Sequence, residues 1–62
     1  MFLEAEFIGQ DKRLVRFNSY KIIINENIAH ICIDDITGFD CPYQSLEAFF
    51  KNWNHIKITF YS

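Results

Sequence analysis

The stretch Tyr20–Asp34, YKIIINENIAHICID, decides the fold class of this chain. Two isoleucine-rich runs flank the short polar break Asn25–Asn27, and large apolar residues recur in each run at every second position. A period of two is typical of a β-strand with one buried face. Asparagine tolerates a positive φ, which suits a tight turn, so we expect Tyr20–Asn25 and Ile28–Asp34 to form a β-hairpin.

The two arms of this hairpin predict one inner and one outer face. The inner face comprises Tyr20, Ile22, Ile24, Ala29, Ile31 and Ile33. Ile23 and Ile28 then point outward, because successive side chains of a strand lie on opposite faces. Exposed apolar area commonly serves for association with another protein or a second copy. Ile23 and Ile28 are therefore our candidate self-association residues.

The segments on either side of the hairpin predict further strands. In Met1–Ile8, apolar residues at positions 3, 5 and 7 alternate with two glutamates, and in Ile56–Tyr61 apolar and polar residues alternate again. Both patterns indicate half-buried strands. The connecting segments are expected to be a polar turn at Gly9–Arg13, a loop that packs Leu14, Val15 and Phe17 back on the core, and a loop or turn at Asp34–Asp40.

One short helix is predicted near residues 46–54, before the last strand. Apolar residues with the i, i+3, i+4, i+7 spacing of one helical face lie at Leu46, Phe49, Phe50 and Trp53. Ser45 precedes them as an N-cap. We expect this face to close the core, with Trp53 buried in it.

These elements predict a single domain, residues 1–62, that is mainly β with one short helix. Four or five short antiparallel strands indicate a small curled sheet or an SH3-like barrel, with the helix covering an open end. Curling is expected because a flat sheet of this size would leave long unpaired edges. A chain of 62 residues also lies near the lower limit for a self-sufficient core.

Composition and charge exclude several function classes. The net charge of −2 comes from acidic and basic residues that are mixed along the chain, without the basic patch that a nucleic-acid partner requires. No apolar run approaches the roughly 20 residues needed to cross a bilayer. The start of the chain, MFLEAEF, carries two glutamates and lacks the basic residues of a signal peptide. We expect a cytoplasmic protein with no membrane partner.

The ionisable and nucleophilic residues do not match a catalytic or metal-binding pattern. Cys32 and Cys41 lack the close ligand spacing of a zinc site, even with His30 and His55 included, and we interpret them as free thiols. His30 and Cys32 share a strand face, but at roughly 6–7 Å such neighbours are too far apart for a hydrogen bond. The acids Asp34, Asp35 and Asp40 lack calcium-loop spacing. We expect no metal, no cofactor and no enzymatic activity.

Two segments of the chain resemble a known group of proteins. Glu6–Ile24, EFIGQDKRLVRFNSYKIII, resembles a FIGKD-type start, and Cys41–Trp53, CPYQSLEAFFKNW, resembles a PYSSLEAFLKNW-type end. Both occur in small, mostly uncharacterised SH3-like proteins encoded by phages, prophages and plasmids of low-GC Gram-positive bacteria. The resemblance covers about half of the chain and departs at Phe17–Ser19, where the group carries a Gly-Lys-containing turn. It implies an SH3-like β-barrel and a mobile-element origin.

Three functions follow as hypotheses. The leading one is an accessory protein that binds and inhibits a host defence enzyme or complex, of the anti-CRISPR or anti-restriction type. Aromatic and acidic side chains suit such contacts, and the candidate partner-binding residues are Asp35, Phe39, Asp40 and Tyr43, with Phe2 and Tyr61 as further unexplained aromatic residues. The second is a structural or assembly module of a phage that self-associates through Ile23 and Ile28 or a free strand edge. The third is a small enzyme.

Overall fold

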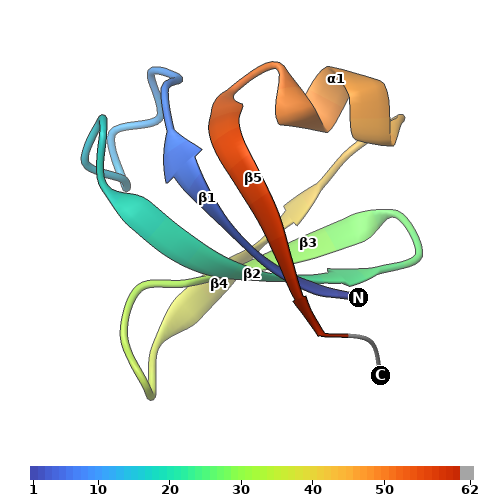
Figure 1. Ribbon diagram of the computed structural model, residues 1–62, viewed down its shortest axis with the longest axis horizontal. Helices are drawn as coiled ribbons and strands as arrows, with labels where there is room; N and C mark the ends of the chain where they lie inside the picture. The colour runs from blue at the N-terminus through green and yellow to red at the C-terminus, as the bar shows by residue number, and fades with distance from the viewer. Residues whose placement is uncertain (61–62) are drawn as a thin grey trace.

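The chain forms one five-stranded antiparallel sheet with a single short helix (Figure 1). The computed structural model describes residues 1–60, so Tyr61 lies outside the described residues. The elements are β1 (Phe2–Phe7), β2 (Ser19–Asn25), β3 (Ile28–Cys32), β4 (Gly38–Pro42), α1 (Leu46–Phe50) and β5 (Trp53–Phe60). The predicted fold class, mainly β with one short helix before the last strand, is confirmed.

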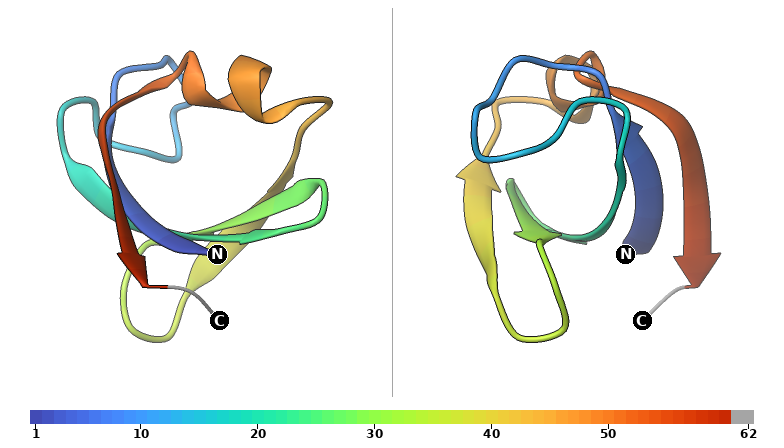
Figure 2. Two further views of the ribbon diagram at one scale, coloured as in Figure 1. Left: turned by 45° about the vertical axis from the view of Figure 1, so that its right-hand side comes forward. Right: turned by 90° about the vertical axis from the view of Figure 1, so that its left-hand side faces the viewer.

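The sheet is curled and open. Its strand order is β4-β3-β2-β1-β5, and every neighbouring pair is antiparallel. Among the described residues β4 and β5 form the two edges and do not pair with each other, so the curled-sheet alternative describes the fold. The helix α1 and the long loop between β1 and β2 lie together at one end of the sheet (Figure 2). The turn between β3 and β4 lies at the other end (Figure 1).

The predicted hairpin is confirmed as β2 and β3. Asn25 lies opposite Ile28, which leaves a two-residue turn. The positive φ falls on Glu26, at 54°, and not on an asparagine as the sequence suggested. Tyr43 explains how this conformation is held, because its backbone N–H donates to the Asn27 carbonyl over 3.0 Å and its hydroxyl donates to the Glu26 carbonyl.

The core lies on the concave face of the sheet. It is formed by Leu3, Ala5, Phe7, Leu14, Ile22, Ile24, Ala29, Ile31, Phe49 and Trp53. The alternation predicted for β1, β2 and β3 therefore holds, and Tyr20 packs against the same cluster. Ile33 was predicted to be buried but is exposed, because β3 ends at Cys32 and Ile33 belongs to the following turn.

Strand β4 corrects the expectation of a loop or turn through Asp40. Residues from Gly38 onward pair with β3, with Phe39 opposite Ile31 and Cys41 opposite Ala29. Phe39 and Cys41 alternate with residues of poor strand propensity, a glycine, an aspartate and a proline. Proline is tolerated because β4 is an edge strand with a free side. Local propensity alone therefore could not identify this strand.

The helix is shorter than residues 46–54. Ser45 is the N-cap, as predicted, and its hydroxyl accepts from the Ala48 N–H over 3.2 Å. The amides of Lys51 and Asn52 each donate three residues back, to Ala48 and Phe49, and these bonds close the helix after one turn. The predicted apolar face is therefore only partly right, since Phe49 is buried while Leu46 is 40% exposed and Phe50 is half-buried.

Trp53 is a core residue, as predicted, but it begins β5 and is not helical. Its ring lies 5.1 Å from Phe7, 6.2 Å from Tyr20 and 5.9 Å from Phe49, measured between centroids. His55, expected in the connection, lies within β5 with φ 51°, where the register with β1 shifts. Ile56 and Ile58 belong to the apolar positions of the predicted alternating strand, and they are 43% and 46% exposed because β5 is a sheet edge.

The loop between β1 and β2 packs on the core only in part. Leu14 is buried, as expected, whereas Val15 is exposed and Phe17 is 64% exposed. Phe17 adopts φ 73° because its N–H is held over 2.7 Å by the Phe7 carbonyl while the chain turns into β2. The expectation of a fully packed loop was therefore wrong for Val15 and Phe17.

Replacing Trp53 with alanine should lower the free energy of unfolding by about 3–5 kcal/mol, the usual loss for a buried aromatic side chain. Leu46→Ala, a change on the exposed side of α1, should lower it by less than about 1 kcal/mol. Urea denaturation followed by circular dichroism measures both. A loss below about 1 kcal/mol for Trp53→Ala would show that the indole does not support the core.

Candidate partner-binding surface

The turn between β3 and β4 is fixed by its own hydrogen bonds. One carboxylate oxygen of Asp34 accepts from the backbone N–H groups of Ile36 and Thr37, both over 2.8 Å. The Thr37 carbonyl in turn accepts from the N–H groups of Ile33 and Asp34. The Thr37 and Ile36 donors hold the pKa of Asp34 below its usual value, because they stabilise the charged carboxylate. The hydrogen bonds that order the turn therefore favour Asp34 in its charged carboxylate form.

Ile36 and Asp35 project from this turn into solvent. The Ile36 side chain is 93% exposed, the most exposed large apolar residue of the described chain. Asp35 beside it is also exposed. An aliphatic side chain that directly follows an exposed acid on a structured turn presents an apolar contact and negative charge together. Sequence reasoning selected Asp35 and missed Ile36, although an isoleucine inside the predicted loop was a usable signal.

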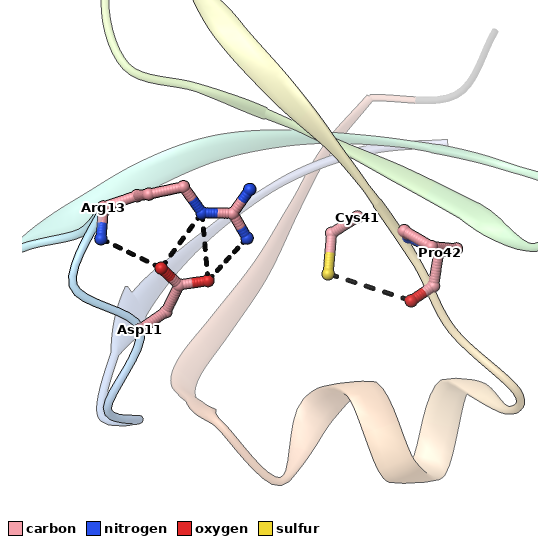
Figure 3. A network of polar contacts seen from close by, with 4 residues as sticks. All are labelled: Asp11, Arg13, Cys41 and Pro42. Atoms are coloured by element: carbon pink, nitrogen blue, oxygen red, sulfur yellow. Dashed lines mark hydrogen bonds and ion pairs between the residues drawn. The ribbon is translucent and has the colours of Figure 1, made fainter.

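Phe39, the second predicted site residue, lies on the concave face of β4 beneath Arg13. The Arg13 guanidinium carbon is 3.8 Å from the centroid of the Phe39 ring, a cation–π contact. Arg13 is held in place by Asp11, with Nη2 to Oδ2 at 2.6 Å and Nε to Oδ1 at 3.0 Å. Figure 3 shows this pair in the β1–β2 loop, with the guanidinium directed toward Cys41 of β4. Phe39 thus joins the loop to the sheet.

Asp40 lies on the opposite, convex face of β4. Its Oδ1 is 2.7 Å from Nδ1 of His30, the residue directly across on β3, and both side chains are solvent-accessible. Gly38 makes room for this arrangement, because a Cβ there would lie 2.9 Å from His30 Nε2 and 2.4 Å from the Ile31 carbonyl oxygen. His30 therefore pairs with Asp40 across the strands, and not with Cys32 on its own strand.

Tyr43, the fourth predicted residue, stabilises the fold from within. Besides its two bonds to the β2–β3 turn, its ring packs at 5.4 Å from the ring of Phe49. The four predicted residues are thus not brought together. Asp35 and Asp40 are exposed, whereas Phe39 and Tyr43 are half-buried in contacts within the chain.

The predicted self-association residues do share the convex face. Ile23 lies between Phe2 and His30 across the sheet and is half-buried, and Ile28 lies opposite Pro42 and is exposed. A largely apolar hollow of about 470 Å³ adjoins Ile23 and is lined by Phe2, Leu3, Lys21, Ile22, Ile23, Cys32 and Thr59.

The remaining chemical candidates stay apart. Cys32 and Cys41 are free thiols, and they lie on opposite faces of the sheet because their partners across the strands are Lys21 and Ala29. His55 Nε2 lies 3.7 Å from Glu6 on an exposed edge. Within the part of the chain that the structure describes, no three histidine, cysteine or acidic side chains come together to hold a metal ion.

Residues 1–60 also contain no helix with the length and apolar character of a membrane-spanning segment. In comparisons with known proteins, no family model, no curated protein and no solved structure matches the chain significantly.

The Asp11–Arg13 pair should make stability depend on acid pH. Hydrogen bonds from the Arg13 side chain and then its backbone lower the pKa of Asp11 from 3.8 to about 2. A lowered folded-state pKa adds stability above the unfolded value, and this stability is lost as the pH falls toward the folded value. Asp11→Asn should therefore flatten the fall in unfolding free energy between about pH 4 and pH 2.

Urea titrations at several acid pH values measure this slope. Arg13→Ala should flatten this slope in the same way. The variant lacks the side chain whose hydrogen bonds lower the pKa of Asp11 most. Equal slopes for the wild type and both variants would contradict a stabilising role of the pair. The absolute change should be modest because both side chains are accessible to water.

Proposed function

We propose that this chain is a non-enzymatic accessory protein of a mobile genetic element. It binds a host protein in the bacterial cytoplasm and inhibits a defence enzyme or complex of the restriction or CRISPR type. The observation that carries the proposal is Ile36, 93% exposed on a structured acidic turn. The resemblance of two segments to phage-encoded proteins supports the mobile-element origin.

The physical argument starts from the preorganisation of the turn. Because Asp34 already fixes the backbone of Ile36 and Thr37, binding needs to order little of the chain and loses less conformational entropy. An aliphatic side chain that enters an apolar pocket of the partner would then contribute directly to affinity.

The charge around the turn indicates the chemistry of the partner. Asp35 and Asp40 are exposed carboxylates on the turn and on the strand that leaves it. Such charges complement a basic surface and accelerate association with it. Enzymes that act on nucleic acids carry basic surfaces, since they neutralise phosphates. In this proposal Asp35, Ile36 and Asp40 make the contact, while Phe39 and Tyr43 fix the segments that carry them.

The proposal predicts a gain of phage plating in a defended host. Expression of the chain in low-GC Gram-positive strains with an active restriction or CRISPR system should raise the plating efficiency of a targeted phage. The double variant Asp35→Asn/Ile36→Ser should lose this effect. Its affinity for the isolated target should fall at least about tenfold, equivalent to roughly 1.4 kcal/mol.

A matched control keeps the same chemical changes away from the turn. Glu47→Gln/Val15→Ser removes one exposed carboxylate and one exposed aliphatic side chain on α1 and the β1–β2 loop, and it should keep full activity. The wild type and the control variant should copurify with one host protein at a fixed ratio. The turn variant Asp35→Asn/Ile36→Ser should not copurify with it. Unchanged plating in both kinds of defended strain would contradict the proposal.

The convex face favours a second candidate, a self-associating assembly module. The apolar hollow beside Ile23, together with exposed Ile28, offers a contact area for another copy. For this candidate Ile23→Lys yields a folded monomer from an oligomeric wild type, whereas changes at Asp35 and Ile36 have no effect on assembly.

A further inference from the structure

The C-terminal half of β5, from Lys57 onward, lies at an open edge of the sheet formed by the described residues. Within the described residues, β5 has a single partner strand, β1. It is also the longest strand, eight residues against six in β1. Figure 2 shows β5 at one margin of the curled sheet and β4 at the other. An edge strand carries unpaired backbone donors and acceptors, which can pair with another chain.

The side chains along this edge are apolar on the core side. Ile58 lies opposite Leu3, which is 1% exposed, so Ile58 shares the concave face with the core. Ile58 nevertheless remains 46% exposed, and Ile56 43%. A further strand on the free side of β5 would cover both residues and remove apolar surface from water.

The hydrogen bonds of β1 show which residue of β5 turns its backbone outward. Met1 exchanges backbone bonds with Ile24, and Phe7 bonds to Phe17 and Asn18, so the odd-numbered residues of β1 face β2. Leu3 is one of these residues. In an antiparallel pair, opposite residues both face each other with their polar groups or both face away. Ile58, opposite Leu3, therefore directs its N–H and C=O toward the free edge, within a short regular stretch of β5 that two register shifts bound, between Phe2 and Leu3 and between Glu4 and Glu6 of β1.

A second copy related by a two-fold axis at Ile58 would pair with the outward backbone groups of this edge. The two Ile58 residues would exchange their outward N–H and C=O groups, as a hydrogen-bonded antiparallel pair does. Lys57 would then lie opposite Thr59 of the second copy. An axis at Lys57 would instead place the two lysines opposite each other, and like charges in that position are destabilising. Charge and backbone orientation therefore both favour the axis at Ile58 over the axis at Lys57.

We propose that the protein forms a homodimer in which the β5 strands of two copies pair antiparallel about Ile58, joining the two sheets into one. The contact is isologous and closes on itself. The outer edge of the joined sheet is β4 in each copy, where Pro42 lacks an N–H and limits further addition of strands. The turn that carries Ile36 belongs to this other edge and stays accessible, so the dimer extends the proposed function without depending on it.

The test is sedimentation equilibrium of the purified chain over roughly 1 µM to 1 mM, the range in which weak and moderate homodimers dissociate. The wild type should be a monomer–dimer equilibrium. Ile58→Lys should raise the dissociation constant at least about tenfold. Ile36→Lys, a matched change at an exposed isoleucine in the turn before the opposite edge strand β4, should leave it unchanged, and so should Ile23→Lys on the convex face.

Amide hydrogen exchange on the wild type tests the same contact without a substitution. The Ile58 amide should become protected as the concentration rises, while the exposed amide of Asp35 should not. Should Ile58→Lys fail to fold, Ile56→Thr serves as the second edge variant. Any one of three results would overturn the proposal. The wild type could be monomeric at every concentration, or the exchange of the Ile58 amide could be independent of concentration. In the third, Ile23→Lys weakens the dimer and the edge variants do not.

Discussion

The packing of the Trp53 indole against Phe7, Tyr20 and Phe49 is the contact on which the rest of this structure depends. These four rings come from β5, β1, β2 and α1, so one aromatic cluster joins three adjacent strands of the sheet to the helix. In a chain of this length no second layer of structure is available to cover the concave face. The curl of the sheet, with the helix and the β1–β2 loop at one end, provides that cover.

The same constraint explains where apolar surface remains. The cover reaches Leu3 and Ile31 but not the lower part of β5, where Ile56 and Ile58 stay accessible. On the loop side, Arg13 completes the cover over Phe39, and Asp11 holds the guanidinium there. A charged side chain thus takes the place of a hydrophobic one at the rim of the core, which is possible because its stem and planar head pack on the ring while water still reaches the charge.

Sequence predicted the parts of this fold that local pattern determines. The alternation in β1, β2 and β3 and the cap at Ser45 each depend on neighbours in the chain, so they were readable. Strand β4 was not, because Gly38, Asp40 and Pro42 disfavour strands and only pairing with β3 stabilises it. The candidate site divides in the same way. Asp35 and Asp40 are exposed, as acids in a predicted loop should be. The structural role of Tyr43 could not be predicted from local pattern, because its hydroxyl bonds to the Glu26 carbonyl 17 positions away.

The two proposed surfaces follow from the two edges of one open sheet. At β4 the edge is interrupted by Pro42 and ends in a structured turn, so it offers side chains, an isoleucine and carboxylates, to a partner. At β5 the edge is long and Ile58, between two shifts of register, directs its backbone N–H and C=O outward, so it offers hydrogen bonds to another strand. Recognition by side chains can be specific for one foreign surface, whereas recognition by backbone requires a matching strand. A self-complementary β5 supplies that strand from the chain itself, and pairing there would give each assembly two acidic turns and thereby two contacts with a multivalent target.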